Sequence, residues 1–505
     1  MRISLLFLLA GCPTDEVEFP GDTGDTGAVD TDDTDDTDDT DDTDDTDDTD
    51  DTDDTDTGGP YVPIERSIDD ADRVLAGTDT WGYSGGSLST AGDLDGDGLP
   101  DLIVGAYNET TGAAHSGAVY LVTAADLAAA DPSVDHRLPT IGRELVGDGP
   151  FSGAGIKVEG GEDVDGDGLA DVIVAAFHNP YDTGFNGVHI FSSPATGAGT
   201  SGSMDDAEAS FACAGSRASG SAAFGGDADS DGREDVLIGC PWDGAGGVVY
   251  VMDASTPGLQ GPADARSSLE YGVEGYFAGE TLTTLGDVDG DGLEDLGVGG
   301  RGMDSWEARG YAWVVVDHDA GDHAMGDQAH TLISETPGDY GGYQLVRAGD
   351  ADGDGRDDVL VTAMASDFGA DNGGAIMLLS GVTWAAGSTT SLPDGVTLML
   401  YGTDAEGYAG AWSAPAGDVD GDGERDLLIG GATGWLQYGP FGTGTVPLSG
   451  VADSITGTSE YGVAGLAGLG DINADGFDDF AVADRGADTD MLEAGKTYLF
   501  YGAER

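Results

Sequence analysis

Aspartates recur in this sequence at a spacing that suits metal binding. The string Gly-Asp-x-Asp-x-Asp-Gly-x-x-Asp, with small variations, occurs seven times, about once every 63 residues. Each copy places carboxylates at its first, third, fifth and ninth positions, counted from the first Asp, and a glycine that permits a sharp turn. The carbonyl of the seventh position can add a further oxygen. Hard oxygens arranged in this way suit Ca²⁺, which accepts roughly six to eight of them in a flexible shell.

The seven copies offer similar ligand sets, and we expect about seven Ca²⁺, one per repeat. The expected ligands are Asp93, Asp95, Asp97, Leu99, Asp101; Asp163, Asp165, Asp167, Leu169, Asp171; Asp227, Asp229, Asp231, Arg233, Asp235; Asp287, Asp289, Asp291, Leu293, Asp295; Asp350, Asp352, Asp354, Arg356, Asp358; Asp418, Asp420, Asp422, Glu424, Asp426; and Asp471, Asn473, Asp475, Phe477, Asp479. Because four carboxylates surround one dication, the metal-free loops should repel themselves. Asn473 removes one charge, so we expect the seventh site to be the weakest.

Three other interpretations of these loops fit less well. An EF-hand would need Glu at the twelfth position between two helices, whereas Val104 and Val174 stand there in the first two copies. Mg²⁺ demands stricter octahedral geometry and retains water. Asp and Gly are also common in plain turns, but seven repetitions of the same pattern favour metal binding.

Short apolar runs follow the loops and predict buried strands. Leu102–Val104 directly follows the first loop, and Ala118–Val122 comes soon after it. Runs of this length, rich in β-branched residues and bounded by Gly, read as strands. Antiparallel sheets repeated around an axis close into a β-propeller, which leaves no long free edge. We therefore predict an all-β, seven-bladed propeller over residues 66–505, with Arg73–Gly77 completing the last blade.

An aromatic-Gly element precedes most of the loops. The aromatic stands ten residues before the first Asp at Tyr83, Phe277, Tyr340, Tyr408 and Tyr461, and twelve before it at Phe151, whereas repeat three has Arg217. Turns such as Gly105-Ala106-Tyr107 and Gly239-Cys240-Pro241 follow the strands. This unit resembles the FG-GAP repeat of integrin α-subunit propellers. The resemblance implies adhesion, but integrin α-subunits act with a β-subunit and carry further domains.

The N-terminus reads as an export signal. Ile3–Ala10 is apolar, and Leu9-Ala10-Gly11-Cys12 resembles the lipobox of bacterial lipoproteins. We expect residues 1–11 to be removed and Cys12 to carry lipid. The alternative is a plain secretory signal with a chance cysteine. We accordingly expect a location at the bacterial envelope or surface, with the outer membrane favoured, or else secretion.

A strongly acidic stretch follows the signal. Residues 31–54 are eight Thr-Asp-Asp triplets, and residues 13–57 hold no Lys, Arg or His. Such a run repels itself and cannot bury apolar surface, so we predict a disordered stalk over residues 12–65. A loose calcium-collecting role is a weaker alternative, because nothing fixes a coordination geometry.

The overall charge limits the partners. The chain has 98 Asp plus Glu against 17 Lys plus Arg, a formal charge of -81. Nucleic acid and anionic lipid would be repelled, so we expect no nucleic-acid partner and contact with a membrane only through the lipid anchor. We expect a monomer whose partner is an extracellular protein or glycan.

Several weaker signals remain. Gly82-Tyr83-Ser84-Gly85-Gly86 matches G-x-S-x-G, but a nucleophile elbow needs a strand-to-helix turn, and here the string is the aromatic-Gly element of repeat one. The segment 317–330, rich in Asp and His, could hold a second metal or be a solvated loop. Cys213 and Cys240 could form a disulfide or remain as two buried thiols.

These observations favour a calcium-stabilised adhesion or ligand-binding module and not an enzyme. The calcium loops would lie on one rim of the ring, and loops of the opposite rim would contact the ligand. Two alternatives stay open: an enzyme or lectin with a site in the central cleft, and a structural envelope protein. A converging His, Arg, Tyr and Glu cluster at the ring axis would favour the first of these alternatives.

Overall fold

The structure is a computed structural model that describes residues 62–176, 187–192, 194, 196–214, 221–226, 234–254, 256–273, 277–300, 309–316, 321–334, 336–459 and 462–505. The predicted signal, Cys12 and the stalk up to residue 61 lie outside these ranges. Residues 62–505 form one compact unit.

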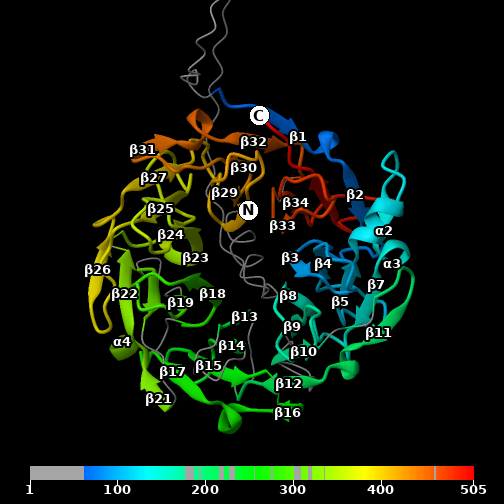
Figure 1. The fold of residues 1–505 in the computed structure, drawn as a ribbon, viewed down its shortest axis with the longest axis horizontal. Helices are drawn as coiled ribbons and strands as arrows, with labels where there is room; N and C mark the ends of the chain where they lie inside the picture. The colour runs from blue at the N-terminus through cyan, green and yellow to red at the C-terminus, as the bar shows by residue number, and fades with distance from the viewer. Residues whose placement is uncertain are drawn as a thin grey trace, which may run out of the picture. The chain divides into compact units, whose positions relative to one another are not determined.

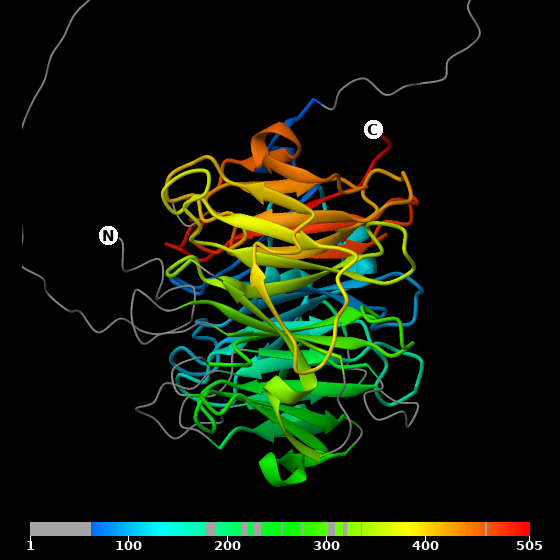
Figure 2. The same cartoon turned by 90° about the vertical axis from the view of Figure 1, so that its left-hand side faces the viewer.

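Seven five-stranded sheets surround a central axis in this unit (Figure 1). Each sheet is one blade, and this confirms the predicted seven-bladed β-propeller. Figure 2 shows the same ring from its side. The apolar runs that follow the Asp loops form the second strand of their blades, as the sequence indicates.

Four strands of each blade run antiparallel from the axis outward. The innermost strands are β3 (Ser87–Gly92), β8 (Ala154–Gly160), β13 (Ser221–Phe224), β18 (Thr281–Gly286), β23 (Gly341–Gly349), β28 (Trp412–Gly417) and β33 (Gly465–Gly470). The second strands are β4 (Asp101–Ala106), β9 (Val172–Ala176), β14 (Asp235–Cys240), β19 (Asp295–Gly300), β24 (Asp358–Ala363), β29 (Asp426–Gly430) and β34 (Asp479–Asp484).

The third and fourth strands complete the antiparallel part. The third strands are β5 (Ala118–Val122), β10 (Gly187–Phe191), β15 (Val248–Asp253), β20 (Tyr311–Val315), β25 (Ala375–Leu379), β30 (Gly434–Gln437) and β35 (Lys496–Phe500). The fourth strands are β7 (Arg143–Val146), β12 (Ala209–Ala212), β17 (Ser267–Glu270), β22 (Ala329–Ser334), β27 (Leu398–Tyr401), β32 (Asp453–Thr456) and β2 (Arg73–Ala76).

A fifth, outer strand runs parallel to the fourth strand of each blade, and the sequence analysis did not predict it. Each outer strand comes from the segment that leads to the fourth strand of the next blade. The connection of every blade therefore pairs with the sheet of the blade before it. The outer strands are β11 (Ser201–Ser203), β16 (Gly258–Gln260), β21 (Gly321–Ala324), β26 (Thr389–Leu392), β31 (Gly444–Pro447), β1 (Glu65–Ser67) and β6 (His136–Arg137).

Short helical turns accompany these connections. They are η1 (Ile68–Asp70), α2 (Ala124–Ala129), α3 (Leu138–Ile141), η2 (Met204–Asp206), η3 (Pro262–Asp264), α4 (Met325–Gln328) and η4 (Leu448–Gly450). Side-chain caps fix some of them. The Ser67 hydroxyl accepts a hydrogen bond from the Asp69 N–H, and the Asp70 carboxylate accepts one from the Ser67 N–H.

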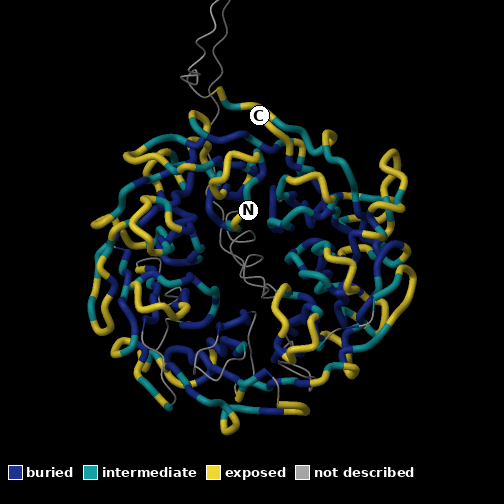
Figure 3. The backbone as a smooth tube through the Cα atoms, in the orientation of Figure 1, coloured by how far each residue is buried: buried dark blue, intermediate teal, exposed yellow. Residues whose placement is uncertain are grey.

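The core lies between the blades. All residues of β4 and β5 are buried, because a neighbouring blade covers each face of their sheet (Figure 3). One apolar cluster joins Leu75 and Leu499 of the last blade to Leu102 and Tyr120 of the first. Further clusters join successive blades around the ring. Strands buried on both faces explain the continuous apolar runs that replace the alternation of a half-exposed sheet.

The first strands of the chain close the ring. β2 pairs antiparallel with β35, with Arg73 opposite Leu499, which confirms that residues 73–77 complete the last blade. β1 pairs parallel with β32 of the sixth blade. β1 includes Glu65, the final residue of the predicted stalk. The N-terminal segment thus contributes to two different blades.

Candidate metal sites

The described Asp loops join the first and second strands of their blades, so they lie on one face of the ring. Six of the seven loops belong to the described residues. In the third loop, Asp227, Asp229, Asp231 and Arg233 lie outside the described residues, and Asp235 begins β14.

The first aspartate of each described loop organises the turn. In the first loop, Asp93 Oδ1 accepts hydrogen bonds from the N–H groups of Gly96 at 2.7 Å and Asp97 at 3.1 Å, and its Oδ2 accepts one from Gly98 at 2.9 Å. Gly96 and Gly98 have φ of 79° and 87°, the left-handed region that favours glycine. Asp163, Asp287 and Asp418 accept the corresponding bonds from the matching glycines of their loops.

The ninth-position aspartate is buried beneath the loop. The carboxylate of Asp101 accepts from the N–H of Leu94 at 2.9 Å and from the N–H of Ala124 at 2.8 Å. It thereby ties the loop to the start of α2, after the third strand. Burial, with a smaller contribution from Asp95 and Asp97, raises the pKa of Asp101 to about 7. Asp295, Asp426 and Asp479 have pKa values of about 7, and Asp358 of about 6, with burial as the largest cause.

Five loops bring three carboxylates together, with ligand oxygens within 4.8 Å of one another. In four of them these are the first, third and ninth aspartates, and in the fourth loop they are the first, third and fifth. The sets are Asp93, Asp95, Asp101; Asp163, Asp165, Asp171; Asp287, Asp289, Asp291; Asp350, Asp352, Asp358; and Asp418, Asp420, Asp426. Burial and then the fifth-position carboxylate raise the pKa of Asp95, Asp289 and Asp420.

The other predicted ligands lie at the loop tips. In each described loop the backbone N–H of the seventh position donates to the carboxylate of the fifth position. The donor–acceptor pairs are Leu99–Asp97, Leu169–Asp167, Leu293–Asp291, Arg356–Asp354, Glu424–Asp422 and Phe477–Asp475. These bonds hold the fifth carboxylates near the turn. Such a set of hard oxygens, dense in negative charge and partly desolvated, fits a calcium-like dication.

The seventh loop departs from the others. The Asn473 side-chain amide donates to Asp475 Oδ2 at 2.9 Å. This hydrogen bond joins the third and fifth positions, which are both aspartates in the other loops. Ala474 has φ of 62°, where the corresponding residues of the other described loops are glycines. A side chain in the left-handed region is strained.

The opposite face of the ring is built by the turns that follow the second and fourth strands. The aromatic-Gly residues Tyr83, Phe151, Phe277, Tyr340 and Tyr408 all adopt left-handed φ there, between 47° and 59°. Tyr461 and Arg217 lie outside the described residues. Large apolar side chains are exposed on these turns, among them Trp81, Phe151, Trp242 and Phe368.

Turns of the adjacent blades contact these aromatic residues. His115 stacks on Phe151 with ring centroids 5.3 Å apart, and the Tyr408 N–H donates to the Asn372 carbonyl at 2.9 Å. The aromatic-Gly elements at Phe151 and Tyr408 thus join one blade to the next, which gives this part of the repeat a structural role.

The remaining sequence signals fall into structural roles. Ser84 is buried on a turn that leads into a strand, without the helix that a nucleophile elbow needs. In the segment 317–330, residues 317–320 lie outside the described ranges. Asp322 accepts from Ser268, His323 contacts Gln328, and His330 lies between Ser388 and Thr390. These side chains have separate partners and do not converge.

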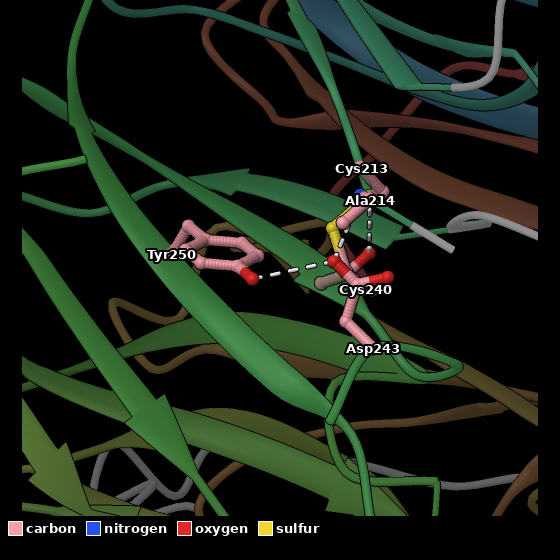
Figure 4. Close-up of a disulfide and its surroundings, with 6 residues drawn as sticks. Cys213, Ala214, Cys240, Asp243 and Tyr250 are labelled. Carbon is pink, nitrogen blue, oxygen red and sulfur yellow. Dashed lines mark hydrogen bonds between the residues drawn. A yellow bond between two sulfur atoms is a disulfide. The ribbon is translucent and has the colours of Figure 1, made fainter. Parts of the chain in front are cut away.

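Cys213 and Cys240 form a disulfide in the structure, with Cα atoms 5.8 Å apart (Figure 4). Cys213 follows β12 of the second blade and Cys240 ends β14 of the third, so the bond crosses between blades. Beside it, Asp243 accepts from the Ala214 N–H at 2.9 Å and from the Tyr250 hydroxyl at 3.2 Å.

Parts of this chain are similar to proteins of known families. The FG-GAP repeat family matches residues 84–122, which run from the first aromatic-Gly element through the first Asp loop to the end of β5. The chain contains an FG-GAP repeat. The five other described Asp loops lie between the first and second strands of their blades in the same way.

Integrin α subunits are among the proteins that parts of this chain resemble. Integrin alpha pat-2 of Caenorhabditis briggsae is 38% identical over 104 residues, which cover 21% of this chain and 8% of the integrin. Integrin alpha-PS2 of Drosophila melanogaster is 32% identical over 158 residues, covering 28% and 11%. Integrin alpha-5 of Xenopus laevis is 31% identical over 220 residues, covering 41% and 19%. The matches thus span less than a fifth of these integrins.

Among solved structures, a crystal structure of BBS1N in complex with ARL6DN covers 86% of this chain and 97% of that one, with a TM-score of 0.42 and 8% identity. Among the described residues, no helix has the length and apolar character needed to cross a membrane.

Proposed function

We propose that this chain is a calcium-dependent adhesion or ligand-binding module, exposed at a cell surface and tethered through Cys12 and the acidic stalk. The single observation that supports it most is the division of the ring into two faces. One face repeats the Asp loops, and the other exposes aromatic side chains on variable turns. The similarity to integrin α subunits supports an adhesion role.

The loop residues have a structural task in this proposal. Asp101 and its counterparts join the loop to the strand layer beneath it, while the first aspartates set the turn. Bound calcium would offset the repulsion among the carboxylates of each loop. The rigid loops would then hold the blade spacing on which the opposite face depends.

The axis of the ring supports binding rather than catalysis. On the described innermost strands the charged side chains are Lys157, Glu159 and Arg347. Lys157 Nζ lies 4.0 Å from Glu159, and Arg347 binds Asp357 at 2.9 Å and lies 3.7 Å from Glu294. They form ion pairs with neighbours instead of a converging catalytic set. These ion pairs favour the proposal of a protein or glycan binder over a catalytic site at the axis.

Thermal melts of the full chain, with calcium titrated from excess chelator to millimolar, test the metal part of the proposal. A ligand that binds the native state must raise the midpoint. We expect a large rise and a calorimetric stoichiometry near seven. An unchanged midpoint would mean that the Asp loops act as turns alone.

The binding face is tested separately. The calcium-loaded chain is applied to glycan arrays and to arrays of immobilised extracellular proteins, beside Trp81→Ala and Phe368→Ala variants. Loss of binding in these variants, but not in the matched Leu259→Ala variant on the outer strand β16, supports the assignment. Equal binding by all three variants would place the ligand elsewhere.

A further inference from the structure

Consecutive Asp loops lie against one another at six junctions of the ring. The residue before the first aspartate is glycine in six of the seven loops, and a Cβ built on each would lie 2.0 to 3.3 Å from the eighth-position residue of the next loop. The pairs are Gly92–Ala170, Gly226–Glu294, Gly286–Asp357, Gly349–Arg425, Gly417–Asp478 and Gly470–Pro100. A side chain at these positions would press on the next loop, most strongly at Gly92, Gly286 and Gly417, so the loops are closely packed at these junctions.

Backbone hydrogen bonds reinforce three of these junctions. The N–H of Ala170 donates to the carbonyl of Asp93 at 2.9 Å. The N–H groups of Asp357 and Asp478 donate to the carbonyls of Asp287 and Asp418, each at 3.0 Å. In each case the donor directly precedes the ninth-position ligand of its own loop, and the acceptor belongs to the first ligand of the loop before it.

Two junctions are reciprocal. The carboxylate of Asp357 accepts from the Asp287 N–H at 3.1 Å, and that of Asp478 accepts from the Asp418 N–H at 2.8 Å. Arg347 also holds Asp357 in place through bonds of 3.1 and 2.9 Å. The first ligand residue thus has both backbone polar groups bound by the next loop.

The junction from the seventh loop to the first differs. Pro100 occupies its eighth position, packs against Gly470, and has no N–H to donate. The ring of contacts continues there, but the hydrogen bond is chemically impossible.

We propose that the loops bind calcium cooperatively, and that the eighth-position residue of each loop carries the coupling to the preceding loop. The inference rests on the proposed function. Binding must order a loop whose carboxylates repel one another, and ordering costs conformational entropy. When calcium orders one loop, that loop's backbone hydrogen bonds also hold the first ligand residue of the preceding loop. Calcium binding to the preceding loop then has a smaller conformational-entropy penalty. Coupling is strongest at the reciprocal junctions and weaker where no backbone hydrogen bond joins the loops, as at Pro100.

Calcium titrations of the full chain test this inference, with ion number from calorimetry and the Hill coefficient from tryptophan fluorescence. Asp478→Ala removes the accepting carboxylate but keeps the ligand Asp479, and alanine already stands at this position in the second loop as Ala170. We expect an unchanged number of ions, a Hill coefficient closer to one, and an affinity about 5-fold lower for the affected pair.

Pro100→Ala is the opposite variant, because it introduces an N–H at the junction that lacks one. We expect a higher Hill coefficient with the same number of ions. Parent protein that binds several ions with a Hill coefficient of one, or variants that leave the coefficient unchanged, would overturn the coupling and leave the proposed function intact. An absence of calcium binding would overturn both.

Discussion

The backbone N–H of Ile64 donates to Asp453 Oδ1 at 2.8 Å, across 389 positions of the chain. Asp453 is fully buried and also accepts from Arg66, from the Tyr438 hydroxyl at 3.1 Å and from Arg505 at 3.4 Å. Arg505 in turn lies over the Tyr438 ring at 3.8 Å. Both ends of the propeller therefore converge on one carboxylate of the sixth blade.

Replacement of this carboxylate should loosen the closure of the ring. Asp453→Ala leaves the Ile64 N–H and two partly exposed arginines without their acceptor, and we expect a loss of about 2 to 3 kcal/mol in the free energy of unfolding. Denaturant melts measure it. Asp394→Ala, on an exposed turn of another outer connection, is the control and should change stability by less than about 0.5 kcal/mol. Similar losses in both variants would refute a specific role for Asp453.

The seventh loop should respond to restoration of the repeat pattern. Asn473→Asp replaces the hydrogen bond to Asp475 with carboxylate repulsion, so we expect a lower melting midpoint without metal and a larger rise with calcium. The added carboxylate should also tighten binding at this loop. Calorimetry of the parent and the variant checks both effects. Asp95→Asn in the first loop should have the opposite effects, a higher melting midpoint without metal and weaker calcium binding. A uniform effect with and without calcium would contradict the assignment of loop seven as a metal site.

The disulfide should make a measurable contribution to stability. Cys213 and Cys240 are 27 residues apart. A cross-link that closes a loop of this length lowers the entropy of the unfolded chain and thereby raises the free energy of unfolding by about 3 to 4 kcal/mol. We expect the Cys213→Ser, Cys240→Ser double variant to melt lower than the oxidised parent. Reductant should lower the midpoint of the parent but not that of the variant. A parent unaffected by full reduction would contradict the estimate.

Glu109 should make the stability depend on pH. Its side chain is 1% exposed and accepts from Thr78 Oγ1 at 3.2 Å; burial, with a smaller effect of Glu144, raises its pKa to about 7. The folded state therefore binds this proton more tightly than the unfolded chain. Its contribution to stability is fully present below about pH 4.5 and is lost as the pH rises through about 7.

Glu109→Gln removes this dependence because the amide stays neutral. Relative to the variant, the parent should lose on the order of 3 kcal/mol between pH 4.5 and pH 8. Denaturant melts at several pH values and a fixed calcium concentration give the difference. Glu504→Gln, at an exposed position, should follow the parent at every pH. Parallel curves for parent and Glu109→Gln would show that Glu109 does not titrate in this range.

The sequence by itself determined the number of blades, the second and third strands, and which residues cluster in the Asp loops. These features are local: a run such as Leu102–Val104 is apolar because its strand is covered on both faces, and Asp93 shapes its turn through residues within five positions. Repetition then made each local signal visible seven times.

Only the tertiary structure decided how the copies join. The outer strands, the convergence on Asp453, the Cys213–Cys240 bond and the loop-to-loop contacts of Gly286 and Gly417 link separate repeats. Their residues are glycines, aspartates and short polar segments without hydrophobic periodicity. Such contacts depend on where a neighbouring blade lies in space, and that position follows from the closure of the whole ring rather than from any single repeat.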